Sequence, residues 1–249
     1  MSELTAAGVQ EAFAAFASPE RATNQAWFFK TGPGEYGEGD RFIGATVPQS
    51  RLVAKQFAGL PEADIFELAQ SPIHEHRHCA LVILVNRFKR AKTQAQRDEL
   101  FDLYMRLLDG GRVNNWDLID ISAPYLGDWW ADKPDAAKGL AALAAHQDLW
   151  HRRAAIMFTF SLVRDGRFEH TLAIAEQLLG DQHDLIHKAV GWMLREVGNR
   201  DRKALEVFLQ KFAPVMPRTM LRYAIEKLDE PSRKAWLAVP RHAAARARG

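Results

Sequence analysis

The sequence lacks several features that define other classes of protein. Its 249 residues include one cysteine, Cys79, so no disulfide can form within the chain and a disulfide-stabilised secreted fold is excluded. No stretch approaches the roughly 18 consecutive apolar residues that a membrane-spanning helix needs. The N-terminal segment MSELTAAGVQEAFAAF carries acidic residues where a secretory signal would carry basic ones. We therefore expect a cytoplasmic protein that makes no membrane contact.

A strong charge of one sign is also missing. The formal net charge is only +2, so a nucleic-acid-binding surface would have to be a local patch. Hydrophobic residues make up 47% of the chain, which is enough for one sizeable core. We expect a single domain spanning residues 1–249.

Alternation typical of β-strands is absent, and the apolar spacing is helical almost everywhere. Short breaks that contain Gly, Pro or Asp, such as LDGGR and RDGR, separate the helical segments. Pairs of segments recur roughly every 35–40 residues, close to the spacing of HEAT-type helical hairpins. The pattern predicts an all-α solenoid whose concave side forms a groove for a long partner. The clearest helical segments are RLVAKQFAGL, HCALVILVNRF, DELFDLYMRLL, AAIMFTFSLV, TLAIAEQLL, HKAVGWMLREV and RKALEVFLQKF.

Two segments depart from this pattern. Residues 31–44 contain five glycines and a proline, which predicts a structured loop. These glycines do not lie between a strand and a helix, so no nucleotide cofactor is expected. Residues 238–249 end in RHAAARARG and are expected to form a mobile basic tail, either a frayed terminus or a non-specific phosphate contact.

The segment 185–200 places a tryptophan on its polar side. At about 100° per residue, its apolar side comprises Ile186, Val190, Met193, Leu194 and Val197. Trp192 lies opposite, between Lys188 and Arg195. Either another helix covers the indole, or the basic and aromatic stripe binds nucleic acid. Gly191 suggests close approach of another backbone or of a ligand.

The stretch NNWDLID, residues 114–120, predicts a second unusual helix face. One of the asparagines can cap the helix. Trp116 and Asp120 are four residues apart and share a side, whereas Leu118 and Ile121 point roughly the opposite way. Asp117 is expected to stabilise the helix N-terminus.

A third segment, WHRRAAIMFTFSLV, predicts a buried helix that begins with two adjacent arginines. Arg152 and Arg153 would be costly to bury without partners. The two alternatives are an ion pair within the protein and an arginine that also reaches a phosphate.

The histidines of HEHRHC raise the question of a metal site. His74 and His78 are four residues apart, which permits a shared metal, but no third ligand at suitable spacing is evident. We expect ordinary histidines on a helix surface, and no metal. Cys79 is expected to be a small buried residue.

Taken in order, these segments resemble the AlkD-like DNA alkylation repair family, which are HEAT-like-repeat DNA glycosylases. The resemblance covers most of the chain and rests on QAWFFK, RFIG, HEHRHCALVIL, NNWDLID, LGDWW, LWHRRAAIMF, IHKAVGWMLREVG and PRTMLRYAIEKL. It implies a right-handed α-solenoid of HEAT-like hairpins with a concave, basic DNA-binding groove.

By the same resemblance, the protein would excise cationic N3- or N7-alkylated purines from duplex DNA as a monofunctional, cofactor-free monomer. The family's active-site positions correspond here to Trp116, Asp120, Arg153 and Trp192. Asp120 would stabilise an oxocarbenium ion and position water, and the two tryptophans would flank the sugar. The alternative is a non-catalytic HEAT-like scaffold that binds DNA or a protein partner.

Further DNA contacts are expected from basic and aromatic residues outside this quartet. For the N-terminal aromatic position, Trp27 is preferred and Phe28 is the second choice. The full predicted DNA-binding set is Trp27, Lys30, Arg152, Lys188, Arg195 and Arg222.

Overall fold

A computed structural model of the chain describes residues 3–240, and regular structure in this range is helical. The exception is an isolated parallel bridge between Arg41 and Ile73. Residues 241–249, which include most of the predicted tail, lie outside the described part. Within residues 3–240, no helix is both long and apolar enough to cross a bilayer.

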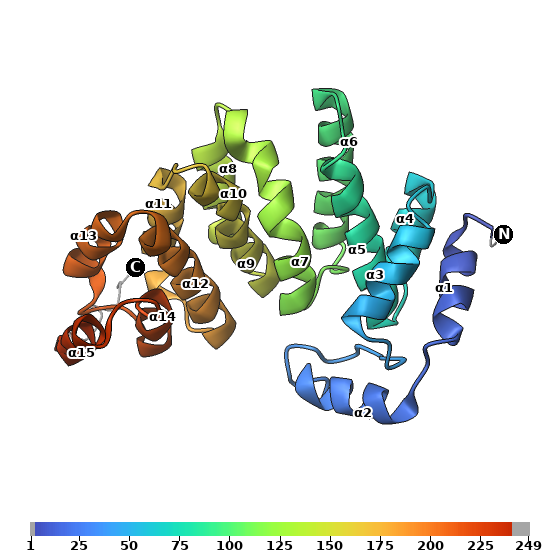
Figure 1. The fold of residues 1–249 in the computed structure, drawn as a ribbon, viewed down its shortest axis with the longest axis horizontal. Helices are drawn as coiled ribbons and strands as arrows, with labels where there is room; N and C mark the ends of the chain where they lie inside the picture. Colours follow the sequence, from blue (N-terminus) through green and yellow to red (C-terminus); the bar gives the residue numbers. More distant parts are fainter. Residues whose placement is uncertain (1–2, 241–249) are drawn as a thin grey trace. The chain divides into compact units, whose positions relative to one another are not determined.

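The chain forms two compact units, which meet in the sequence at Ser122 and Ala123 (Figure 1). The single domain stays a prediction. The helices of the first unit are α1 (Ala6–Ala14), α2 (Pro19–Phe28), α3 (Val47–Gln56), α4 (Glu62–Ala69), α5 (His74–Phe88) and α6 (Gln94–Asp109). Helix α7 (Trp116–Leu126) begins in the first unit and ends in the second.

The second unit has the same helical character. It contains two 3₁₀ segments, η1 (Gly127–Asp132) and η2 (Leu178–Gly180). Its helices are α8 (Ala136–Ala144), α9 (Leu149–Phe158), α10 (Phe160–Arg164), α11 (Glu169–Gln177), α12 (Asp184–Arg200), α13 (Arg202–Phe212), α14 (Arg218–Ala224) and α15 (Glu230–Ala238). The predicted all-α fold of stacked helices is confirmed. The right-handed path and the basic groove stay predictions.

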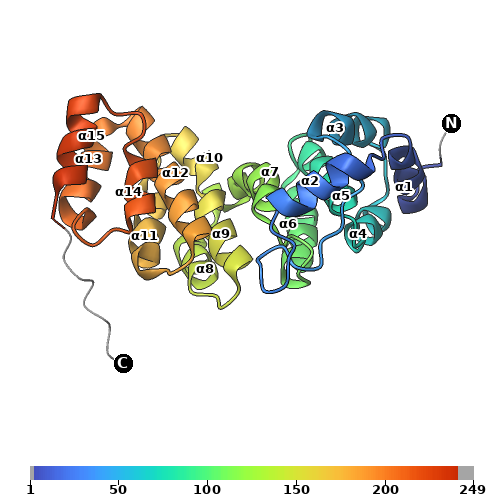
Figure 2. The same ribbon diagram turned by 90° about the horizontal axis from the view of Figure 1, so that it is seen from below.

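Each unit is built around one long helix. In the first, α5 packs against both α3 and α4 (Figure 2), and its apolar residues other than Val82 are buried. In the second, α12 packs against α13, α14, α9 and α10. The breaks predicted by LDGGR and RDGR lie after α6 and α10. Gly111 and Gly166 adopt φ values of 68° and 78° there, which favour glycine.

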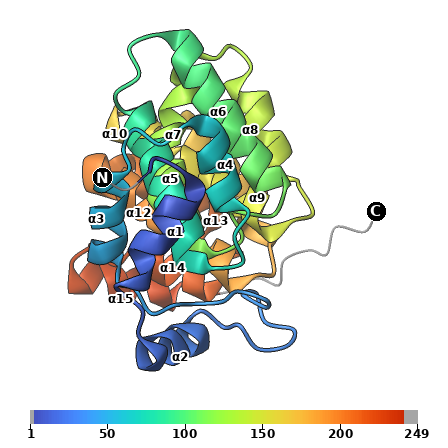
Figure 3. The same ribbon diagram turned by 90° about the vertical axis from the view of Figure 1, so that its right-hand side faces the viewer.

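Helix α2 is the least buried helix of the first unit. None of its residues is buried, and Figure 3 shows α2 and the following loop extending away from α1 and α3. The loop consists of turns and is attached to the first turn of α5. There, Glu75 accepts hydrogen bonds from the backbone N–H groups of Ile43, Gly44 and Ala45. This attachment fixes the end of the loop on the core of the first unit.

Candidate active site

Helix α7 presents Trp116 and Asp120 on a face that is only partly buried. The helix begins after Asn115, whose Oδ1 accepts a hydrogen bond from the Trp116 N–H at 2.8 Å. Leu118 and Ile119 are fully buried, whereas Trp116 and Asp120 are half-buried. The indole and the carboxylate therefore share a face outside the core, and neither is sealed inside it.

An aromatic cluster packs on Trp116. The ring of Phe29 stacks on Trp116 with centroids 5.4 Å apart, and Phe28 meets the indole edge-on at 6.0 Å. Phe42, from the glycine-rich loop, stacks on Phe29 at 5.2 Å. The sequence argument missed Phe29 and Phe42, because the contact depends on how the loop folds back.

The predicted N-terminal DNA contact lies on the outer side of α2. Trp27 is 75% exposed, and the ammonium of Lys30 lies 5.1 Å from the centroid of its ring. Phe28, the second choice for this position, is 56% exposed and contacts Trp116. Trp27 and Lys30 together form an exposed cation–aromatic pair.

Beneath the aromatic cluster lies a buried network of charges centred on His74. Its Nδ1 lies 3.0 Å from Asp40 Oδ2, and its Nε2 lies 2.8 Å from Asp117 Oδ2. Arg77 donates to the other Asp40 oxygen at 2.6 Å. Burial alone would lower the pKa of His74, but the Asp117 and Asp40 carboxylates outweigh it and raise the pKa to about 9. Burial would likewise raise the pKa of Asp40, but His74 and Arg77 lower it.

The prediction of surface histidines in HEHRHC is wrong. His74, His76 and His78 are only 3%, 7% and 4% exposed, because α3, α4 and the glycine-rich loop cover the first turns of α5. His78 Nδ1 pairs with Ser50 Oγ at 2.7 Å, and burial lowers the pKa of His78 to about 4. Both nitrogens of His74 already face carboxylates, so this pair of histidines does not form a metal site.

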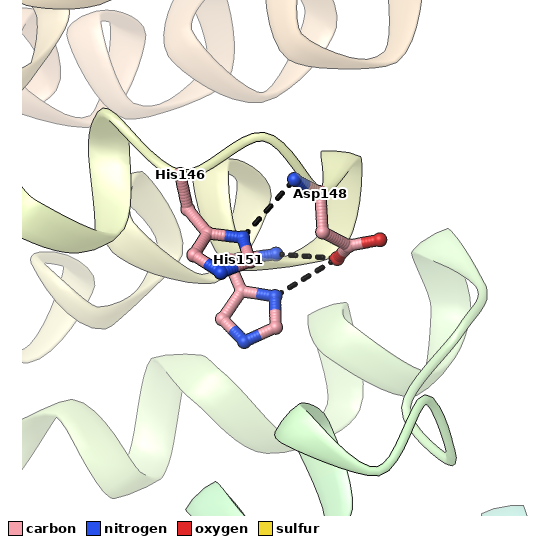
Figure 4. Close-up of side chains that lie close together, drawn as sticks. All are labelled: His146, Asp148 and His151. Carbon is pink, nitrogen blue, oxygen red and sulfur yellow. Dashed lines mark hydrogen bonds and ion pairs between the residues drawn. The ribbon is translucent and has the colours of Figure 1, made fainter.

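A second group with possible metal ligands, at the start of α9, is better explained as a helix cap. His146, Asp148 and His151 each place one ligand atom within 4.8 Å of the others (Figure 4). Asp148 Oδ1 accepts from the N–H groups of Trp150 at 2.9 Å and His151 at 3.2 Å, and from His151 Nδ1 at 2.9 Å. His146 Nδ1 accepts from the Asp148 N–H at 3.0 Å. These N–H donors engage Asp148 Oδ1 and His146 Nδ1, and a helix N-terminus disfavours positive charge.

In the second unit, α12 places Trp192 opposite its buried face, as its spacing predicts. Trp192 is half-buried, and its Nε1–H donates to Glu196 Oε1 at 3.3 Å. Lys188 forms an ion pair with Asp184 at 2.7 Å. Arg195 forms one with Glu226. The predicted stripe is therefore present, with its two cations paired to carboxylates.

Gly191 lies where α12 and α14 come closest. A Cβ at this position would lie 2.5 Å from the Met220 carbonyl oxygen and 2.5 Å from Tyr223 Cβ. The close approach that the glycine suggested is therefore that of another helix backbone. Arg222, on the same helix α14, is exposed.

The two adjacent arginines of α9 have different environments. Arg152 donates to Asp181 Oδ2 at 2.6 Å and to the Gln147 carbonyl oxygen at 2.6 Å. Arg153 is 4% exposed and donates to the Leu185 carbonyl oxygen at 2.5 Å. The ion-pair alternative therefore describes Arg152. The buried guanidinium of Arg153 lies against the first turn of α12, where it contacts Leu185.

The family model described as "DNA alkylation repair enzyme" matches residues 9–228, nearly the whole chain. This chain belongs to the DNA alkylation repair enzyme family. Among curated proteins, none matches the sequence.

A solved structure supports the fold of this DNA alkylation repair family member. It is described as a predicted DNA alkylation repair enzyme from Enterococcus faecalis. The TM-score is 0.67 at 16% sequence identity, and the alignment covers 86% of this chain and 97% of the other. At this identity, the similarity establishes the fold.

Proposed function

We propose that this protein is a DNA glycosylase that excises cationic N3- or N7-alkylated purines from duplex DNA. The observation that carries the proposal is the half-buried pair Trp116 and Asp120 on one face of α7, in a member of a DNA alkylation repair family. A carboxylate beside an aromatic ring suits a substrate whose transition state is positively charged.

The chemistry requires one carboxylate. An N3- or N7-alkylated purine already carries positive charge, so it can leave without being protonated. As the glycosidic bond breaks, the sugar gains oxocarbenium character at C1′. Asp120 would stabilise that charge and orient or deprotonate the attacking water.

The other proposed catalytic residues act on the same charges. Trp116 and Trp192 would flank the deoxyribose, and each cation–aromatic contact would contribute roughly 0.5–2 kcal/mol. Arg153 is proposed as the cation that keeps the Asp120 carboxylate ionised.

For duplex binding we propose Trp27, Lys30, Lys188, Arg195 and Arg222. Trp27 and Arg222 are supported by their exposure, and Lys30 by its position over the Trp27 ring. Lys188 and Arg195 would have to exchange their carboxylate partners for phosphates. Arg152 is engaged by Asp181 and backbone carbonyls, so we propose a structural role for it.

Release of 7-methylguanine from duplex DNA under single-turnover conditions tests the activity. Asp120→Asn is expected to lower the rate constant by about 10²–10⁴-fold, because the carboxylate no longer supplies charge or a base. The matched control is Asp102→Asn, which removes an exposed carboxylate from α6 and should leave the rate unchanged.

A double-mutant cycle then tests whether the two halves of the quartet act on one substrate. If they do, Asp120→Asn and Trp192→Ala together should cost less than the sum of their separate effects on the activation free energy. No base release by the wild type, together with salt-sensitive duplex binding, would favour the scaffold alternative. Release undiminished in Asp120→Asn would reject the assigned role of Asp120.

A further inference from the structure

The buried His74 side chain holds together two segments that are far apart in the sequence. Its Nδ1 faces Asp40, in the glycine-rich loop, and its Nε2 faces Asp117, in the first turn of α7. A carboxylate can only accept hydrogen bonds when ionised, so both ring nitrogens must donate. With both carboxylates ionised, this geometry favours a doubly protonated, positively charged imidazole.

The charge is also enclosed by aromatic rings. Phe29 and Phe42 lie against the His74 ring, with centroids 4.9 and 4.7 Å away. Phe29 in turn stacks on Trp116, which directly precedes Asp117. A rotation of His74 would therefore disturb both the ion pairs and the surface on which the indole rests.

From these contacts we propose that His74 is a positioning residue, whose two ion pairs hold the first turn of α7 in the orientation that presents Trp116 and Asp120 to substrate. This inference rests on the proposed glycosylase function. Burying a cation between two carboxylates costs desolvation free energy, and removing one member of such an ion pair is strongly destabilising. The network therefore specifies one arrangement of the loop and of α7.

Three elements around His74 contribute charged or titratable groups. The loop supplies Asp40 and α7 supplies Asp117. Helix α5 itself supplies Arg77 and Glu75, whose carboxylate is occupied by backbone N–H groups of the loop, and His78. Opposing effects of burial and the two carboxylates leave the pKa of His74 raised to about 9, whereas the pKa of His78 is lowered to about 4.

The protonation state is tested by NMR of the full chain labelled with ¹⁵N-histidine. We expect one histidine with both ring nitrogens protonated at pH 7.5, titrating near pH 9, and absent from His74→Gln. Neutral His74 at pH 7.5 would overturn the proposal. This readout does not depend on base release, so it remains decisive even if the wild type shows no glycosylase activity.

The positioning role is tested by single-turnover release of 7-methylguanine together with affinity for undamaged duplex. His74→Gln is expected to lower the saturated rate constant at least about tenfold, since small misplacements of catalytic groups are costly, with affinity changed less than about twofold. The wild-type rate should fall as pH rises through about 9, and His74→Gln should lack this alkaline fall.

The matched control is His76→Gln, two residues along the same helix. His76 is also buried, but it pairs with Ser71 and packs on Phe13, away from α7. The substitution His76→Gln should lower thermal stability while leaving the rate of base release by the folded protein unchanged. An equal loss of rate in both variants, or a wild-type rate in His74→Gln, would overturn the positioning role. No release by the wild type would reject the proposed function instead.

Discussion

Gly191→Ala is a sharp test of how the second unit is packed. In an exposed helix interior this change stabilises a protein by roughly 1 kcal/mol, because alanine has the higher helix propensity. Here the added methyl group would lie 2.5 Å from the Met220 carbonyl oxygen and 2.5 Å from Tyr223 Cβ. Met220 is completely buried, so the neighbouring backbone cannot move into solvent.

The size of the effect follows from these distances. An ordinary van der Waals contact begins near 3.4 Å, so α12 and α14 must separate by about 0.9 Å (3.4 minus 2.5). Overpacking of this kind costs about 1–3 kcal/mol, and a rigid carbonyl neighbour places the cost in the upper half of that range. After subtraction of the propensity gain, we expect a net loss of about 1–2 kcal/mol in the free energy of unfolding.

Gly198→Ala, in the same helix, is the matched control. Its Cβ would lie 2.4 Å from Leu205 Cδ2, the end of a flexible side chain that can change rotamer. The loss should therefore be clearly smaller than for Gly191→Ala. Urea unfolding followed by circular dichroism and tryptophan fluorescence measures both variants. Gly191→Ala at least as stable as the wild type, or equal losses in the two variants, would refute the packing argument.

Further predictions concern the charged side chains His74, Arg152 and Arg222. In the folded protein the pKa of His74 is about 9, above its ordinary value of 6.5. Protonated His74 therefore contributes about 3 kcal/mol to the free energy of unfolding. This contribution is complete below pH 6.5 and is lost as pH rises through 9. Wild type and His74→Gln should therefore converge in unfolding free energy across that window, and a difference independent of pH would contradict this. Arg152→Ala should cost about 1–3 kcal/mol of stability because Asp181 loses its partner, whereas Arg222→Ala should weaken duplex binding with little change in stability. If Arg152→Ala weakened duplex binding without lowering stability, Arg152 would be a DNA contact and not a structural residue.

Much of the fold and part of the candidate site were predictable from local spacing. Apolar periodicity located the long helices, and Gly111 and Gly166 marked the ends of α6 and α10. The same periodicity predicted that Trp192 lies off the buried face of α12, which the structure confirms. These properties depend on the 3.6-residue turn of a helix, which determines which residues a few positions apart lie on the same face.

The surroundings of that site were not predictable in the same way. The sequence suggested surface histidines at the start of α5, but the loop and two helices cover them. It left open whether Arg152 pairs within the protein, and Asp181 provides the answer from 29 positions away. The periodicity of one helix cannot predict such partners, because they lie on other elements of the fold.

By itself, the sequence determined the helical class, the family resemblance, and the shared face of Trp116 and Asp120. Tertiary structure alone decided that Phe29, Asp40 and Asp117 converge on His74. The physical reason is the range of each interaction. Side-chain periodicity acts within one helix, whereas a buried cation acquires its partners only when the loop and two helices have packed around it.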